Sequence, residues 1–130
     1  MLLGLKVSER VAGMRTLPPG IDQRSSSRHP DWSGPDDLVI KIEELREATN
    51  WEKPIYVKVG ATRVAYDVKL AVAAGADVLV VDGMQGGTGA TQDVFIENAG
   101  IPTMPAVRMA ADALREIGKH HEVQLHCTKF

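Results

Sequence analysis

The chain has 130 residues, enough for one domain or part of one, and its composition (44% hydrophobic and 25% charged residues) is typical of a globular protein. A formal net charge of −2 gives no electrostatic basis for binding nucleic acid or an anionic membrane, and no segment resembles a signal peptide or a membrane span. The single cysteine, Cys127, excludes an intrachain disulfide and a metal cluster held by several cysteines of this chain. We therefore expect a cytoplasmic protein.

The N-terminal part predicts little regular structure. Residues 5–12 favour a short helix, and residues 14–35 form a long polar connection rich in proline and glycine. A connection of this length is usually a functional loop or a disordered segment. We therefore divide the chain into an N-terminal segment with a candidate active-site loop, residues 1–35, and a region of alternating strands and helices, residues 36–130.

The first half of that region predicts a helix, a strand and a second helix. A helix begins at Asp36, with Leu38, Ile42 and Leu45 spaced for one face. Residues 55–60 predict a short buried strand that contains one lysine. The next helix is expected to be capped by Thr62, and its apolar face comprises Val64, Val68, Ala71 and Val72.

The second half continues the same alternation. Residues 77–81 predict an apolar strand, and a glycine-rich loop and a short helix around residues 92–98 follow it. A longer helix is expected over residues 104–117, and a third strand begins at residue 123. The predicted inner face of the longer helix comprises Val107, Ala111, Leu114 and Ile117.

This alternation predicts an α/β fold with a parallel sheet. Strands that are apolar on both faces fit an open sheet or a barrel, and periodicity does not distinguish the two. Three strands cannot close an eight-stranded barrel, which typically takes ~250 residues. We therefore expect this chain to be a piece of a larger protein.

The loop over residues 82–90 (DGMQGGTGA) is the strongest candidate for a ligand site. It has four glycines within residues 83–89, so its backbone N–H groups can converge on a ligand, and a helical segment follows. The spacing matches neither a Walker loop nor a dinucleotide-binding fingerprint. Asp82 is either a ligand contact or a cap for the loop, and Gln85 either binds substrate or braces the loop.

Other polar residues allow a functional and a structural interpretation. Lys58 lies within an apolar strand, where an unpaired buried ammonium would be costly, so a functional role is favoured. His29, next to a proline, is more consistent with bracing a loop than with catalysis. The pair His120 and His121 is expected at a solvated helix end.

Four segments follow one another in a familiar order: residues 13–20 (GMRTLPPG), 28–31 (RHPD), 56–59 (YVKV) and 82–90. Together they resemble the FMN-binding synthase domain of the glutamate synthase family. The likeness is closest to stand-alone glutamate-synthase-like subunits, which include N-methylglutamate synthase, and it extends from about residue 2 to residue 125.

The resemblance implies a (β/α)8 TIM barrel, of which about three β/α units lie in this chain. It implies FMN, and an iron–sulfur cluster whose ligands lie outside these residues. The implied reaction, part of glutamate biosynthesis and nitrogen metabolism, reduces an imine of 2-oxoglutarate with ammonia or an amine to L-glutamate or N-methylglutamate. Glutaminase-like and electron-transfer subunits are the implied partners, and the isolated chain is expected to be inactive.

The resemblance also assigns residues. Lys58 matches a lysine near the flavin N1/C2 carbonyl, where a fixed cation stabilises negative charge on the reduced ring. The residues that match the loop lining the flavin and substrate cavity are Gly86, Gly87, Thr88 and Gly89. Arg28 is a candidate partner for a dicarboxylate substrate, and Asp82 and Gln85 are further candidate substrate contacts.

One departure from the family pattern affects the substrate. Glutamate synthases have His and Asp where this chain has Met84 and Gln85, and the less charged pocket favours a substituted amine. Two alternatives remain open. One is a flavin barrel like the 2-hydroxy-acid oxidases, which would need a histidine at this place. The other is a truncated remnant, or a half-barrel that binds a ligand without catalysis.

Overall fold

A computed structural model describes residues 2–24, 29–84, 94 and 98–128. The described elements are η1 (Gly4–Lys6), α1 (Glu9–Arg15), α2 (Pro35–Ala48), β1 (Tyr56–Gly60), α3 (Val64–Ala73), β2 (Val78–Asp82), α5 (Thr103–Glu116) and β3 (Gln124–Thr128). The three strands form a parallel sheet in the order β1-β2-β3. This confirms the α/β class and the three predicted strands.

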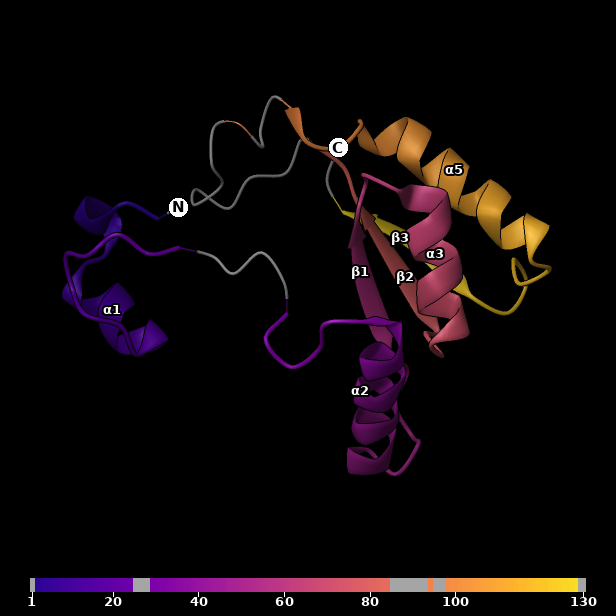
Figure 1. The fold of residues 1–130 in the computed structure, drawn as a ribbon, viewed down its shortest axis with the longest axis horizontal. Coiled ribbons are helices and arrows are strands. Elements are labelled where there is room, and N and C mark those ends of the chain that lie inside the picture. The colour runs from indigo at the N-terminus through magenta and orange to yellow at the C-terminus, as the bar shows by residue number, and fades with distance from the viewer. Residues whose placement is uncertain (1, 25–28, 85–93, 95–97, 129–130) are drawn as a thin grey trace.

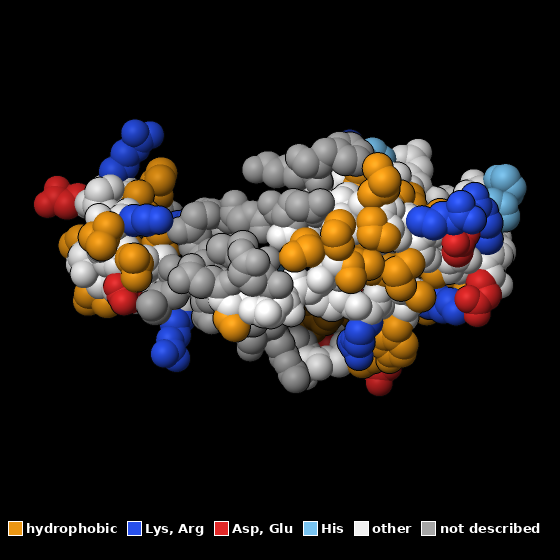
Figure 2. All heavy atoms as spheres, turned by 90° about the horizontal axis from the view of Figure 1, so that it is seen from above, with side chains coloured by type: hydrophobic (Ala, Val, Ile, Leu, Met, Phe, Trp, Pro, Cys, Tyr) orange, Lys and Arg blue, Asp and Glu red, His pale blue; other side chains and the backbone are white. Residues whose placement is uncertain are grey.

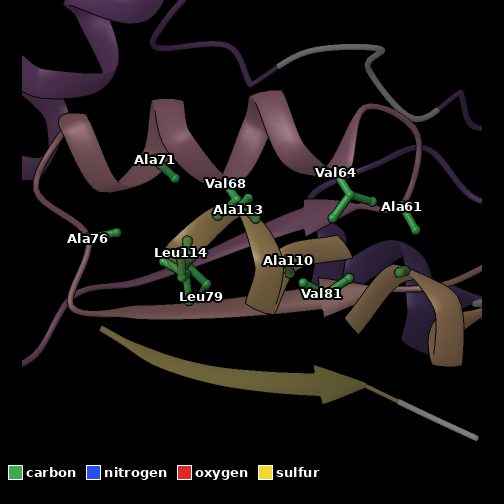
Figure 3. Packing of buried hydrophobic residues seen from close by; sticks show 11 residues of the cluster. Ala61, Val64, Val68, Ala71, Ala76, Leu79, Val81, Ala110, Ala113 and Leu114 are labelled. Atoms are coloured by element: carbon green, nitrogen blue, oxygen red, sulfur yellow. The ribbon is translucent and has the colours of Figure 1, made fainter. Parts of the chain in front are cut away.

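The helices cover one face of the sheet. In Figure 1, α3 and α5 lie on the same side of the strands, α2 lies near one end of β1, and α1 is set apart from the sheet. The main core lies between the sheet and these two helices, and Figure 3 shows Val68 of α3, Leu114 of α5 and Leu79 of β2 close together. Leu79 is fully buried. A smaller cluster joins Leu38 and Ile42 of α2 to Ile55.

The opposite face of the sheet, which we call the open face, carries the alternate residues of each strand. In register, Lys58 lies beside Val80 and then His126, and Gly60 lies beside Asp82 and then Thr128. Lys58 and His126 are exposed. The prediction that the strands are apolar on both faces is therefore wrong for β1 and β3, because each has polar or small residues on the open face.

Several helix predictions need correction at their ends. Residues 5–12 are divided between η1 and α1, and the Val11 N–H donates to the Ser8 hydroxyl at the start of α1. Thr62 does not cap α3. Its N–H donates to the Gly60 carbonyl at 2.8 Å, which makes a tight turn, and the cap position falls on Arg63. The predicted helix around residues 92–98 falls mostly outside the described residues.

The inner face of α5 differs from the predicted one. Thr103, Ala106, Ala110, Ala113 and Leu114 are buried, whereas Ile117 is exposed. Alanines at positions i, i+4 and i+7 let α5 approach α3 and the sheet closely, because they add little side-chain volume. Of the four predicted residues, Leu114 is buried, Val107 and Ala111 are half-buried, and Ile117 is exposed.

Exposed hydrophobic side chains remain on the outside of the helical layer. Met104 and Met109 of α5 are exposed. Figure 2, which views the molecule from above relative to Figure 1, shows hydrophobic side chains spread over this side and charged side chains at both ends of the molecule. Within the described part of the chain, no helix is long and apolar enough to cross a membrane.

Candidate functional site

Two of the predicted site residues, Lys58 and Asp82, lie in the described structure, and both are on the open face. The others lie outside the described residues, and their predicted roles stay predictions: Arg28, Gln85, Gly86, Gly87, Thr88 and Gly89. The structure therefore describes the part of the candidate site that lies on the strands, up to the start of the glycine-rich loop after β2.

Lys58 is held by an ion pair. Its Nζ lies 2.8 Å from Asp82 Oδ2 on the neighbouring strand, and 57% of its side chain is exposed. The expectation that this lysine is buried in its strand is wrong, because alternate residues of an edge strand point away from the helical layer. Its charge is thus available at the surface of the sheet and already has a carboxylate partner.

Asp82 contacts side chains from both neighbouring strands. It is the last residue of β2, and its Oδ1 accepts a hydrogen bond of 2.7 Å from the Thr128 hydroxyl at the end of β3. Sequence analysis missed Thr128. The signal was the alternation of polar and apolar residues over Gln124–Thr128, which places the threonine on the same face as Lys58.

The carboxyl edge of the sheet also has space beside the lysine. Gly60 ends β1 on the open face, and a Cβ built there would have no heavy atom of the described residues within 4 Å. The loops at this edge are tied together, since the Ala61 N–H donates to the Asp82 carbonyl at 2.8 Å and the Ile101 N–H donates to the Ala61 carbonyl at 2.9 Å. In parallel α/β folds this edge is where ligands bind.

A groove of about 680 Å³ extends along β1 from this edge. Residues of β1, α2 and α3 line it, together with His29, Asp31 and Trp32. Its walls therefore include Lys58 and the residues that immediately follow Arg28 in the sequence. A ligand at the carboxyl edge could contact both parts of the chain.

An ion pair between Asp31 and Lys41 connects residues 29–32 to α2. Lys41 Nζ lies 3.0 Å from Asp31 Oδ2, and this hydrogen bond lowers the pKa of Asp31 and raises that of Lys41. The Asp31 N–H donates to His29 Nδ1 at 3.3 Å, and the imidazole lies 5.7 Å from the Trp32 ring. These contacts agree with the loop-bracing role expected for His29.

The described residues contain no group of three or more His, Cys, Asp or Glu side chains that could hold a metal ion. Cys127 is a free, half-buried thiol on the helix-covered side of β3, opposite to Thr128. His120 and His121 are exposed beyond α5, as predicted, with ring centroids 3.9 Å apart.

Comparison with known proteins gives the family. The family model described as the conserved region in glutamate synthase matches residues 1–128. The chain belongs to the glutamate synthase family. This confirms the resemblance inferred from the sequence motifs, and with it membership of a family of oxidoreductases.

Individual relatives agree with the family model. A glutamate synthase large subunit-like protein of Rhizobium meliloti (strain 1021) is 70% identical over 125 residues, which cover 96% of this chain and 28% of that protein. An archaeal glutamate synthase [NADPH] of Methanocaldococcus jannaschii is 37% identical, over 95% of this chain and 24% of that protein. An archaeal-type glutamate synthase [NADPH] of Thermotoga maritima is 41% identical, over 92% of this chain and 24% of that protein. This glutamate synthase family chain therefore spans about a quarter of the length of the curated relatives it matches.

Proposed function

We propose that this chain is part of an FMN-dependent glutamate-synthase-type oxidoreductase, and that its three strands are consecutive strands of a (β/α)8 barrel. Family membership supports the reaction class. The strand order β1-β2-β3 and the helices on one face of the sheet support the barrel, since neighbouring barrel strands are consecutive in sequence and their helices lie outside. The open face is then the barrel interior.

The observation that carries the proposal is the position of Lys58. Its ammonium group lies at the carboxyl edge of the open face, next to the space beside Gly60. A cation beside open space fits the part of a flavin ring where negative charge develops, and a cation fixed there stabilises that charge. When bound and reduced, FMN would supply a hydride (two electrons and one proton) to the imine carbon, while the nitrogen takes up a second proton.

The remaining roles follow from the family resemblance. Gly86, Gly87, Thr88 and Gly89 would shape the flavin pocket, and Arg28 and Gln85 would contact the 2-oxoglutarate-derived part of the substrate. Residues 29–32, which follow Arg28 in the sequence, are connected to α2 by the Asp31–Lys41 pair. The names of two relatives include NADPH, and we propose the same electron source, acting through an iron–sulfur relay outside this chain.

The test uses the complete protein that contains this chain. It is expected to be purified with bound FMN and, after reduction with dithionite, to convert 2-oxoglutarate and ammonium into L-glutamate, or 2-oxoglutarate and methylamine into N-methylglutamate. We expect Lys58→Met to lower the rate of product formation at least about 100-fold, by analogy with removal of one oxyanion-stabilising group.

A matched control is Lys69→Met. Lys69 also forms an ion pair, with Nζ 2.7 Å from Glu116 Oε1, but this pair joins α3 to α5 on the outer side of the helical layer. Loss of this ion pair should leave the rate of product formation unchanged. Full activity of Lys58→Met would contradict the role proposed for Lys58. Absence of FMN would contradict the proposal as a whole and favour a remnant or a ligand-binding half-barrel. The 130-residue chain alone is expected to bind FMN weakly or not at all.

A further inference from the structure

Both carboxylate oxygens of Asp82 are engaged within the sheet. Oδ2 faces the Lys58 ammonium at 2.8 Å, and Oδ1 accepts the Thr128 hydroxyl at 2.7 Å. The two partners come from the strands on either side of β2, so the aspartate connects all three strands through its side chain. A side chain held from both sides has a fixed orientation.

The lysine needs such a partner. A lysine side chain has many accessible rotamers, and this one is more than half exposed on β1. Without the carboxylate, its ammonium group would be distributed over many positions above the open face. With it, the charge is confined to one place beside Gly60.

We infer that Asp82 is the positioning residue of Lys58: its carboxylate, oriented by Thr128, fixes the lysine ammonium at the carboxyl edge of the sheet and offsets part of its charge. The inference rests on the proposed function, and it assigns Asp82 to the lysine in place of the substrate contact predicted from sequence. Asp82 thereby acts on the reaction through Lys58. Thr128 takes part as the group that orients the carboxylate.

The first test measures the lysine itself and needs no flavin. In the complete protein, the acylation rate of Lys58 by an amine-directed reagent is followed by mass spectrometry of its peptide. The contact with the Asp82 carboxylate confines the lysine amine to one place and limits its encounters with the reagent. We therefore expect Asp82→Asn to accelerate acylation of Lys58 several-fold, Thr128→Val to have a smaller effect in the same direction, and Asp82→Glu to restore part of the protection.

The matched control is Asp77→Asn. Asp77 immediately precedes the same strand, roughly 16 Å from Asp82 at the usual rise per residue, and it pairs with Arg46. Its loss should weaken the fold without changing the reactivity of Lys58. Equal acylation rates in the wild type and Asp82→Asn, or equal acceleration by both asparagine variants, would overturn the inference.

The second test measures the midpoint potential of the bound flavin. Asp82→Asn should raise it, because the uncompensated lysine charge favours the reduced ring, and Lys58→Met should lower it. If Asp82 acts through Lys58, Asp82→Asn should shift the potential less in the Lys58→Met background. An equal shift in both backgrounds would overturn the inference while leaving the proposed function intact. Absence of flavin would refute the proposed function, and the acylation result would still decide the pairing.

Discussion

At the scale of single residues, β2 has a carboxylate at each end, and the two differ in what they hold. Asp82 at the carboxyl end binds side chains on the open face, whereas Asp77 precedes the amino end and fastens loops. Asp77 contacts Arg46 of α2 at 3.0 Å and accepts the Ile55 N–H at 2.7 Å. Arg46 also donates to the Gly75 carbonyl at 2.6 Å. Asp82 therefore connects the strands on the open face, and Asp77 connects α2 to the loops before β1 and β2.

The Asp77 pair predicts a loss of stability in acid. Burial raises the pKa of Asp77, but the hydrogen bonds from Arg46 and from the Ile55 N–H, together with the arginine charge, lower it further, so the net shift is downward from 3.8. A carboxylate whose pKa is lowered by folding stabilises the fold at pH values above its pKa in the unfolded state. This contribution disappears as the pH falls through its pKa in the folded state. Below about pH 4, the free energy of unfolding should fall.

The substitution Asp77→Asn tests this contribution. We expect it to lower the free energy of unfolding at pH 7 by about 1 kcal/mol, a modest value because the side chain is partly exposed, and to flatten the dependence on pH between pH 4 and pH 2. Urea unfolding at several pH values measures both. Asp112→Asn is the control, since Asp112 pairs with Arg108 and Arg115 on the outer surface of α5 and should matter little. Unchanged stability of Asp77→Asn at pH 7 would contradict the prediction.

At the scale of elements, the contact between α5 and the rest of the core depends on small side chains. Ala106 and Ala110 are fully buried and Ala113 nearly so, and they belong to the same cluster as Val64 and Val68 of α3. Figure 3 shows Ala110 and Ala113 of α5 near Val81 and Val68, respectively. Close packing of this kind leaves no room for extra methyl groups.

Enlarging one of these alanines should therefore destabilise the fold. We expect Ala110→Leu to lower the free energy of unfolding by about 1–3 kcal/mol through overpacking. Ala111→Leu is the matched control, because Ala111 lies on the face predicted from the hydrophobic pattern and is only half-buried. Thermal or urea unfolding compares the two. If Ala111→Leu were the more damaging variant, the assignment of the inner face would be wrong.

At the scale of the whole molecule, the sheet has one central strand among the described residues. β2 pairs on both sides, and its Leu79 and Val81 are fully buried, whereas β1 and β3 each have one described neighbour. The groove along β1 shows where the edge of that strand is accessible. In a complete barrel the same edge would be covered by another strand, since barrels have no free edges.

Hydrogen exchange distinguishes an accessible edge of β1 from one that another barrel strand covers. In the 130-residue chain, amides of β1 are expected to exchange faster than those of β2, because a strand with one neighbour opens more readily. In the complete protein, the two strands should exchange at similar rates if the barrel closes over β1. Mass spectrometry of peptides that cover residues 56–60 and 78–82 measures both. Fast exchange of β1 in the complete protein would argue against barrel closure at this edge.

The sequence carries enough information to predict the secondary structure and the family of this chain. Periodicity alone predicted the strands, the helices that follow them and the parallel α/β class, because burial repeats every second residue in strands and every three to four in helices. The motifs predicted the family, which the comparisons confirm. They also singled out Lys58 and Asp82, although as separate candidates with unrelated roles.

Only the tertiary structure decided how these residues relate. The register places Lys58 two positions before the residue that faces Asp82, and Thr128 directly beside Asp82, so three residues far apart in sequence form one cluster. The structure also decided that Lys58 is exposed and paired, and that alanines form the inner face of α5. Sequence patterns report which residues tend to be buried. Pairing across strands and packing between helices depend on contacts between distant parts of the chain, which no local pattern contains.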